Sequence, residues 1–255
     1  MNSVLSRLQQ PIWIYAFLFG ALVSRIWVAE DAYITFRMVE NLYAGFRLVF
    51  NPSERIEAAT HPLWMMLLIL IKGIGLPLHS GSILLGLGFS LTGLYLLARG
   101  RLNHGQIPWA ALGLATISGF RDFATAGMEF SLVFLLLVLF WQGLADDSWL
   151  ARPARTGLYL ALLYLTRPEL ALLSIYYGGW FAIDHLRRFT AWGRLVKTGL
   201  LFALPYTIPF IYHLFRWLYY DDLFPNTYYA KAGLDSYFSQ GLVYIFYTLL
   251  WSPAL

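Results

Sequence analysis

The sequence predicts an all-α integral membrane protein, a bundle of several spanning helices, from its composition, its long apolar runs and the placement of its basic residues. Of its 255 residues, 59% are hydrophobic and only 13% are charged, and the mean hydropathy is +0.59. Because soluble domains carry about 25% charged residues, this composition favours a bilayer as the surrounding solvent. No internal repeat is visible, so we expect one contiguous domain over residues 1–255. Apolar runs occupy 11–29, 61–78, 80–98, 107–120, 127–145, 157–183, 198–215 and the stretch from Gly241 onward.

The charged residues and histidines exclude several classes of site. The formal net charge is +4, but Lys and Arg lie in short loops rather than in one basic stripe, so nucleic acid is not an expected partner. The chain has no Cys, which excludes disulfides and thiolate metal sites. No two of its five His residues stand at a spacing typical of a zinc site. We therefore expect no cofactor, and the sequence leaves a requirement for a divalent metal open.

The run at 11–29 is long enough to cross a membrane. It corresponds to about 28 Å of helix, against a hydrocarbon core of about 30 Å. Arg7 precedes this run, as a basic residue does in a signal peptide, but no small-residue cleavage pattern follows. We therefore expect an uncleaved first span.

The direction of every later helix depends on whether the run at 61–78 crosses the membrane. If it does not cross, nine of the 18 Lys and Arg residues fall on the N-terminal side, which the positive-inside rule identifies as cytoplasmic. Lys72 and the breaks at Gly73, Gly75 and Pro77 also oppose a straight span. We expect this segment to rest on the outer face or to re-enter it partly. The cytoplasmic basic segments are then residues 1–10, 99–106, 146–156 and 184–197.

The 27-residue run at 157–183 contains Arg167-Pro168-Glu169 in its middle. An internal proline ends or kinks a helix because it lacks an amide hydrogen. We expect a hairpin of two short helices with its turn near the outer face, which keeps 184–197 inside and shields the two charges from lipid. Residues 30–79, with juxtamembrane helices, and 216–240 are then external loops. The external acidic residues are Glu30, Asp31, Glu40, Glu54, Glu57, Asp122, Glu129, Glu169, Asp221, Asp222 and Asp235.

The acidic pair Glu30-Asp31 directly follows the first span. Behind it, apolar residues recur at roughly helical spacing, which predicts an amphipathic helix along the outer interface. Asp31 either caps this helix, as Asp commonly does, or acts as a general base whose pKa is adjusted by partial desolvation. The spacing leaves both interpretations open. The apolar residues in question are Tyr33, Phe36, Val39, Leu42, Tyr43 and Phe46.

Further ionisable residues fall near the predicted membrane boundary, where such groups usually face a protein interior or a water-filled cavity. They are Glu129, Arg167, Glu169 and several residues of 219–231. Each of them is explained equally well by a structural ion pair and by a contact with a ligand.

Four blocks of residues occur in one order along nearly the whole chain: Glu30 to Trp64, Gly127-Met128-Glu129, Thr166-Arg167-Pro168-Glu169, and Tyr219 to Lys231. The first includes Glu30-Asp31, Asn51-Pro52-Ser53-Glu54-Arg55 and Thr60-His61-Pro62. Together these blocks resemble the GT-C fold glycosyltransferases, and most closely the branch that contains the mycobacterial terminal β-arabinofuranosyltransferase. The resemblance implies a multi-span helical bundle of GT-C type.

This resemblance also implies transfer of a sugar, with inversion, from a polyprenyl-phosphate donor to a glycan or other hydroxyl acceptor on the outer face of a bacterial inner membrane. Asp31 would be the base or acceptor-orienting group, beside Glu30, where this branch usually has Asp. Arg167 and Lys231 become candidates for the donor phosphate, on which charge accumulates as the glycosidic bond breaks. The remaining candidates for substrate contacts are Tyr33, Arg37, His61, Glu129, Glu169, Asn226 and Tyr229.

Related enzymes usually continue well past the position of Leu255, where this chain ends inside an apolar stretch. We expect a fragment, a shortened member of the branch, or one part of an assembly with a partner subunit. A non-catalytic protein that binds or transports a polyprenyl-linked sugar is the alternative. The hydropathy shows no inverted half-repeat, which counts mildly against transport.

Overall fold

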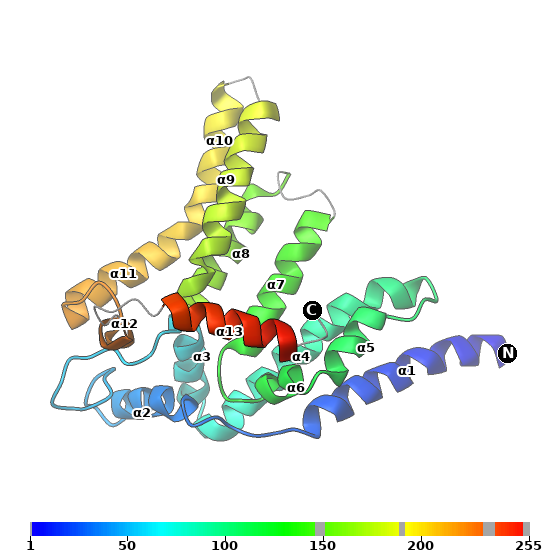
Figure 1. Ribbon diagram of the computed structural model, residues 1–255, viewed down its shortest axis with the longest axis horizontal. Helices are drawn as coiled ribbons and strands as arrows, with labels where there is room; N and C mark the ends of the chain where they lie inside the picture. Colours follow the sequence, from blue (N-terminus) through cyan, green and yellow to red (C-terminus); the bar gives the residue numbers. More distant parts are fainter. Residues whose placement is uncertain (1, 146–150, 189–191, 232–237, 252–255) are drawn as a thin grey trace.

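Helices joined by turns and loops make up the described part of the chain. The structure is a computed structural model that describes residues 2–145, 151–188, 192–231 and 238–251, and these residues form no β-strand. The prediction of an all-α protein is confirmed (Figure 1). The helices are α1 (Asn2–Val23), α2 (Ala32–Tyr43), α3 (Pro62–Gly73), α4 (Leu78–Asn103), α5 (Trp109–Thr116), α6 (Ser118–Ala124), α7 (Phe130–Ala145), α8 (Pro153–Thr166), α9 (Ala171–Arg188), α10 (Trp192–Ala203), α11 (Thr207–Tyr220), α12 (Asn226–Lys231) and α13 (Phe238–Trp251). Two 3-10 turns, η1 (Pro168–Leu170) and η2 (Leu204–Tyr206), separate α8 from α9 and α10 from α11.

Two helical segments of the described chain are long and apolar enough to cross a membrane by length and composition. They are Leu78–Asn103 and Trp192–Tyr220, and the second consists of α10, η2 and α11. Shorter apolar helices occupy Ile12–Val23, Pro62–Gly73 and Phe130–Ala145. A membrane-spanning arrangement thus has support from two helices, and the number of spans stays a prediction.

The first helix is displaced from the run that was expected to span. α1 ends at Val23, and residues 24–29 leave the helix. The amide of Ala29 donates to the carbonyl oxygen of Ala126 at 2.9 Å, and the Trp27 indole donates to the carbonyl oxygen of Asp122 at 2.6 Å. These contacts hold the segment against the α6–α7 connection, so the helix ends six residues before the predicted boundary at residue 29.

The segment at 61–78 forms a helix that is too short to span. Pro62 occupies the first turn of α3, where its missing amide hydrogen costs nothing, and the helix ends at Gly73. Twelve residues give about 18 Å of helix, well below the thickness of a hydrocarbon core of about 30 Å. Gly75 then adopts a positive φ of 85°, which turns the chain into α4.

The predicted break in the run at 157–183 is confirmed. Arg167 is extended, with φ −147° and ψ 121°, and the turn η1 separates α8 from α9. The Ser174 hydroxyl of α9 donates to the Leu160 carbonyl of α8 at 3.2 Å, so the two helices pack side by side as a hairpin.

Two other boundaries differ from the prediction. The run at 107–120 is divided at Ile117, and α11 continues to Tyr220, five residues into the expected loop 216–240.

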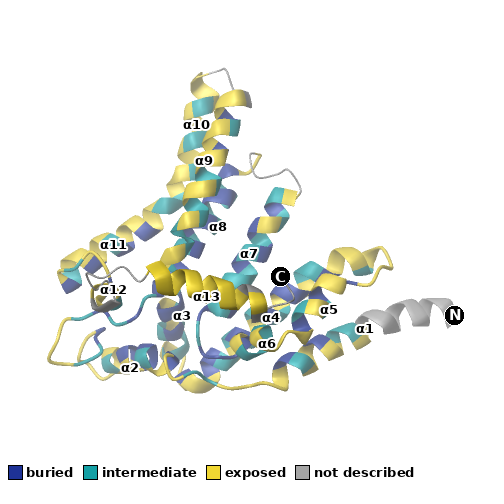
Figure 2. Cartoon of the chain, in the orientation of Figure 1, coloured by how far each residue is buried: buried dark blue, intermediate teal, exposed yellow. Residues whose placement is uncertain are grey.

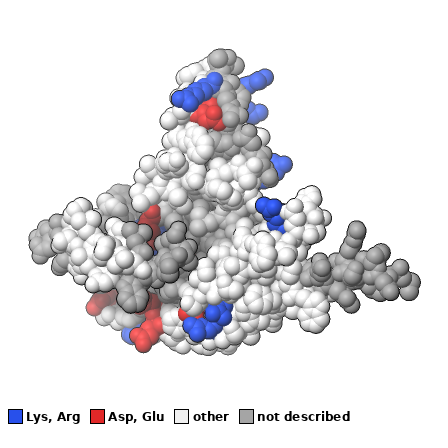
Figure 3. All heavy atoms as spheres, turned by 45° about the vertical axis from the view of Figure 1, so that its right-hand side comes forward, with Lys and Arg blue, Asp and Glu red and all other residues white. Residues whose placement is uncertain are grey.

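The end of the molecule formed by α9 and α10 is mainly basic. Figure 1 places the end of α9 and the start of α10 at one extreme, and α2 with the start of α4 at the other. Figure 3 shows several basic side chains and one acidic group at the first extreme, and side chains of both signs at the opposite end. Arg187 belongs to α9, and Arg194 and Lys197 belong to α10. The expected basic character of this end therefore has a counterpart in the fold, whereas the opposite end is mixed in charge.

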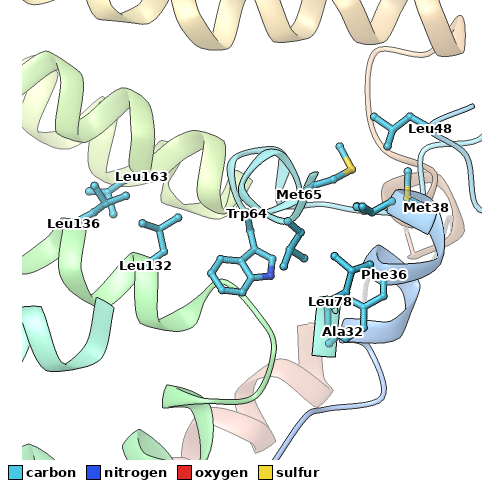
Figure 4. Packing of buried hydrophobic residues seen from close by; sticks show 13 residues of the cluster. Ala32, Phe36, Met38, Leu48, Trp64, Met65, Leu78, Leu132, Leu136 and Leu163 are labelled. Atoms are coloured by element: carbon cyan, nitrogen blue, oxygen red, sulfur yellow. The ribbon is translucent and has the colours of Figure 1, made fainter. Parts of the chain in front are cut away.

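The main core lies where α2, α3, α7 and α8 meet. Trp64 is fully buried at its centre, and its indole donates to the carbonyl oxygen of Gly127 at 3.0 Å (Figure 4). Phe36 and Val39 of α2 pack into this core, whereas Tyr33 and Tyr43 stay exposed. The amphipathic helix predicted here thus exists, and its apolar residues are divided between the core and the outer surface.

Much of α9, α10, α11 and α13 is exposed (Figure 2), and many of the exposed side chains are large hydrophobic ones. Large hydrophobic side chains such as Leu172, Ile175, Phe210 and Leu218 are exposed there. Continuous apolar surface of this extent is unusual in a water-soluble monomer and is the kind of surface that lipid covers.

Candidate active site

Asp31 stands at the start of α2 without capping it through its side chain. It occupies the N-cap position with φ −61° and ψ −25°, and its carboxylate forms no cap hydrogen bond. The side chain is exposed, and it has no hydrogen bond or ion pair with any residue in the described part of the chain. Of the two interpretations left open by the sequence, capping is the one that this geometry does not support.

His61 lies at the start of α3, between Thr35 and Glu129. Its Nε2 atom is 2.7 Å from the Thr35 hydroxyl, one turn beyond Asp31 on α2, and its Nδ1 atom is 3.3 Å from Glu129 Oε2. Burial lowers the pKa of His61, and the negative charges of Glu129 and Asp31 act in the opposite direction. The histidine is therefore held as a neutral ring, within electrostatic reach of Asp31.

Glu129 connects His61 to a basic residue. Its Oε1 atom accepts a hydrogen bond from Arg167 Nη1 at 2.9 Å, and its side chain is only 3% exposed. Arg167 also donates from Nε to Glu169 Oε1 at 2.6 Å, and its guanidinium lies 4.9 Å from the centre of the Phe130 ring. We call the series His61, Glu129, Arg167 and Glu169 the ionic chain. The structure thus brings four of the sequence-predicted site residues together.

The turn that carries Glu129 is fixed by a close approach of backbone to helix. Gly127 has φ +75°, and a β-carbon there would lie 2.8 Å from Val28 and 3.0 Å from Ala32. The carbonyl of Gly127 accepts the hydrogen bond from buried Trp64. Because only glycine fits this position, Gly127 holds the turn before Glu129 against the start of α2.

The structure contains a second buried ion pair, which was not predicted from the sequence. Arg216 Nε of α11 donates to Glu57 Oε2 at 2.5 Å, and the Tyr212 hydroxyl donates to Glu57 Oε1. The Glu57 carbonyl accepts from the Asn226 amide at 3.0 Å, so the pair joins the first loop to α11 and to the start of α12. Glu57 was counted only among the external acidic residues. An arginine at the end of an apolar run, as at Arg216, was the available signal.

A cavity of about 370 Å³ lies between η1, α11 and the loop before α12. Glu169, at one end of the ionic chain, and Pro62, directly after His61, both line it. Tyr164 and His213 face it together, with 2.6 Å between the hydroxyl and Nε2. The cavity therefore borders both the ionic chain and the Glu57–Arg216 pair.

The remaining candidates lie at other places. Arg37 donates to the Phe50 carbonyl at 2.9 Å and thereby holds the first loop. Arg37 and exposed Tyr33 also line a separate open groove of about 650 Å³ beside α3. The Tyr229 hydroxyl accepts from the Phe224 amide at 3.4 Å, and Asn226 contacts the Glu57 carbonyl through its backbone.

Glu30 is exposed beside Asp31. Lys231 ends α12, and its side chain lies outside the described residues. Within the residues that the structure describes, no three His, Asp or Glu side chains are grouped so that they could hold a metal ion.

The fold and the ionic chain define an all-helical, strongly apolar protein with an exposed carboxylate beside a buried polar network. Sequence comparison relates such a chain to glycosyltransferases. It is 35% identical over 251 residues to the terminal β-(1→2)-arabinofuranosyltransferase of Mycobacterium tuberculosis, and 32% identical over 257 residues to the enzyme of the same name from Corynebacterium glutamicum. Each alignment covers 90% of this chain. The predicted resemblance to this branch is thereby confirmed.

The chain spans only 39% and 36% of the length of these two curated relatives. No family model matches the chain. No solved structure matches it either.

Proposed function

We propose that this protein is a glycosyltransferase that moves a sugar from a polyprenyl-phosphate donor to an acceptor hydroxyl, with Asp31 as the general base. The observation that carries the proposal is the exposed Asp31 carboxylate, which forms no cap in a chain related over 90% of its length to arabinofuranosyltransferases. The names of these relatives make an arabinofuranosyl group the first sugar to test.

In the proposed reaction Asp31 accepts the proton of the acceptor hydroxyl. The oxygen attacks the anomeric carbon as the bond to the phosphate breaks, and polyprenyl phosphate leaves with the electron pair, so the configuration at the sugar is inverted. A positioned base of this kind contributes about 10²- to 10⁴-fold in rate.

Arg167 is the residue that we propose for the developing charge on the donor phosphate. Its guanidinium is 30% exposed and is bound by two carboxylates of very different burial, since Glu129 is 3% exposed and Glu169 is 56% exposed. An exposed ion pair contributes little, whereas guanidinium–phosphate contacts are strong. A phosphate can therefore be bound at the exposed side of the guanidinium, while buried Glu129 continues to orient the arginine.

We further propose that the protein lies in a bacterial inner membrane with Asp31 on the outer face. Three observations support this placement: the basic tip of α9 and α10 lies opposite the start of α2, α3 is too short to cross, and the outward helix faces are apolar. Under the positive-inside rule the basic end is cytoplasmic.

The test is the variant Asp31→Asn, assayed in membranes with a polyprenyl-phosphate arabinofuranose donor and a glycan acceptor. We expect transfer to fall by about 10²- to 10⁴-fold, because the amide cannot accept the proton, while donor binding is retained. Glu40→Gln, also an exposed carboxylate of α2, is the matched control and should leave transfer unchanged. Unchanged transfer in Asp31→Asn would contradict the assignment, and donor lipid carried across the bilayer without a new glycosidic bond would instead favour a carrier.

A further inference from the structure

We infer that the cavity between η1, α11 and the loop before α12 binds one sugar ring through two neighbouring hydroxyl groups. The inference rests on the proposed function and assigns a specific subsite to it. The ring belongs either to the lipid-linked donor or to the end of the acceptor glycan, and both present the same vicinal hydroxyls.

The size and the walls of the cavity fit a small polar ring. Its volume of about 370 Å³ is near the lower limit of ligand pockets, about 300 to 1,000 Å³, which favours a single sugar unit over a long lipid tail. Phe224 and Tyr228 form one wall, with ring centres 4.6 Å apart. Flat aromatic faces with a polar edge suit the apolar face of a sugar.

The hydrogen-bond partners of His213 fix the direction of the Tyr164 hydroxyl. Arg216 Nη1 lies 3.2 Å from His213 Nδ1, and because arginine only donates, Nδ1 is the acceptor. The proton of the neutral ring is therefore on Nε2, which donates to the Tyr164 oxygen at 2.6 Å. The hydroxyl proton of Tyr164 is then not used in this contact and is available to a ligand in the cavity.

Glu169 supplies the complementary acceptor. Both contacts with Arg167 involve its Oε1 atom, at 2.6 and 2.5 Å, and Oε2 has no hydrogen-bond partner among the described residues. One donor from Tyr164 and one acceptor from Glu169 therefore line the same cavity. A pair of adjacent sugar hydroxyls, one accepting and one donating, matches this set.

The cavity also has a fixed frame, as a specific binding site requires. Arg216 is held by the buried Glu57 carboxylate and donates to the Leu223 carbonyl at 3.4 Å, next to Phe224. The network from Glu57 through Arg216 and His213 to Tyr164 thus orients the donor before any ligand arrives. Such prior orientation reduces the entropy lost on binding.

The decisive variant is Tyr164→Phe, which keeps the ring and removes the hydroxyl donor. We expect the KM for one substrate to rise by about 3- to 10-fold with kcat little changed, since a single hydrogen bond is lost. A rise in KM for the acceptor alone places the acceptor ring in the cavity, and a rise for the donor alone places the donor ring there. Tyr176→Phe, an exposed tyrosine of α9, is the matched control.

A binding measurement separates this inference from the proposed function. Methyl arabinofuranoside is titrated into the detergent-purified chain and its Asp31→Asn variant by calorimetry. We expect saturable binding to both, weakened about 3- to 10-fold by Tyr164→Phe and by Glu169→Gln. The 2,3-dideoxy glycoside should bind weakly to all of them and should not distinguish Tyr164→Phe from the parent chain.

Each result has a definite meaning. Glycoside binding that is weakened in Tyr164→Phe, while Asp31→Asn retains full transfer, supports the ring site and contradicts the catalytic role of Asp31. The opposite result is also informative. If transfer depends on Asp31 but Tyr164→Phe and Glu169→Gln leave the KM values and glycoside binding unchanged, the ring site is overturned and the proposed function is not. An unchanged circular dichroism spectrum in each variant shows that the fold is intact.

Discussion

The molecule contains two buried carboxylate–arginine pairs that differ in access. In the Glu129–Arg167 pair the carboxylate is 3% exposed but the guanidinium is 30% exposed, and it continues to Glu169 at the rim of the cavity. In the Glu57–Arg216 pair the two side chains are 2% and 4% exposed and are enclosed by Tyr212.

The comparison shows that the same two residue types perform different tasks according to burial. A fully enclosed pair cannot exchange its partner for a ligand, so Glu57–Arg216 acts as a clamp between the first loop and α11. In a pair with one exposed partner, the exposed charged group can still contact a ligand. Arg167 is that group in the Glu129–Arg167 pair.

The largest expected effect comes from Glu57→Gln. The change leaves the Arg216 charge buried without its counter-ion, which costs about 3–5 kcal/mol in the free energy of unfolding. The measurement is thermal or denaturant unfolding of the detergent-solubilised protein.

Two further variants sharpen this result. Glu57→Leu combined with Arg216→Met should restore much of the lost stability, because no unpaired charge is left. Glu40→Gln, which removes an exposed partner of Lys72, should change stability by no more than about 1 kcal/mol. Equal losses for Glu57→Gln and Glu40→Gln would show that the enclosed pair is not a clamp.

A smaller effect is expected from acidification, through His61. Burial holds its pKa in the folded protein below the ordinary value of 6.5, so the unfolded chain binds more protons between these two pKa values. The contribution to stability is therefore complete above about pH 6.5 and decreases as the pH falls through this window. Unfolding measured from pH 7 to pH 5 tests the sign.

The control for this pH dependence is His61→Gln, which keeps polar contacts with Thr35 and Glu129 but does not titrate. Its stability should depend less on pH over the same range. A steeper decrease in the variant than in the parent chain would contradict the assigned direction of the pKa shift.

The smallest effect on stability is expected from Glu169→Gln. Its side chain is 56% exposed, so loss of its ion pair with Arg167 should cost no more than about 1 kcal/mol. Glu129→Gln, at the buried end of the same arginine, provides the contrast and should cost more. If the two variants lose the same stability, the ionic chain has no exposed end in solution.

Several elements of the fold follow from local chemistry. Pro62 begins α3 and Pro168 divides α8 from α9, because proline supplies no amide hydrogen to a helix. The apolar residues of α2 predicted a helix directly after Asp31. The motifs also identified four residues that meet in the ionic chain, although the spacing alone gave each of them a structural explanation as well.

Other elements depend on partners that are distant in the sequence. α1 ends at Val23, and the segment after it pairs through Ala29 with Ala126, a contact that the helical pattern of the sequence does not predict. Arg216 meets Glu57 across 159 positions, and only the packing of α11 against the first loop brings them together.

Composition and neighbours along the chain account for the helical class, the apolar character, the breaks at proline and the resemblance to arabinofuranosyltransferases. Which charges are enclosed, which remain accessible, and the absence of a side-chain cap at Asp31 follow only from the packing of the helices. Desolvation and hydrogen bonding depend on what surrounds a group in space, and in this protein those surroundings come from helices far apart in the chain.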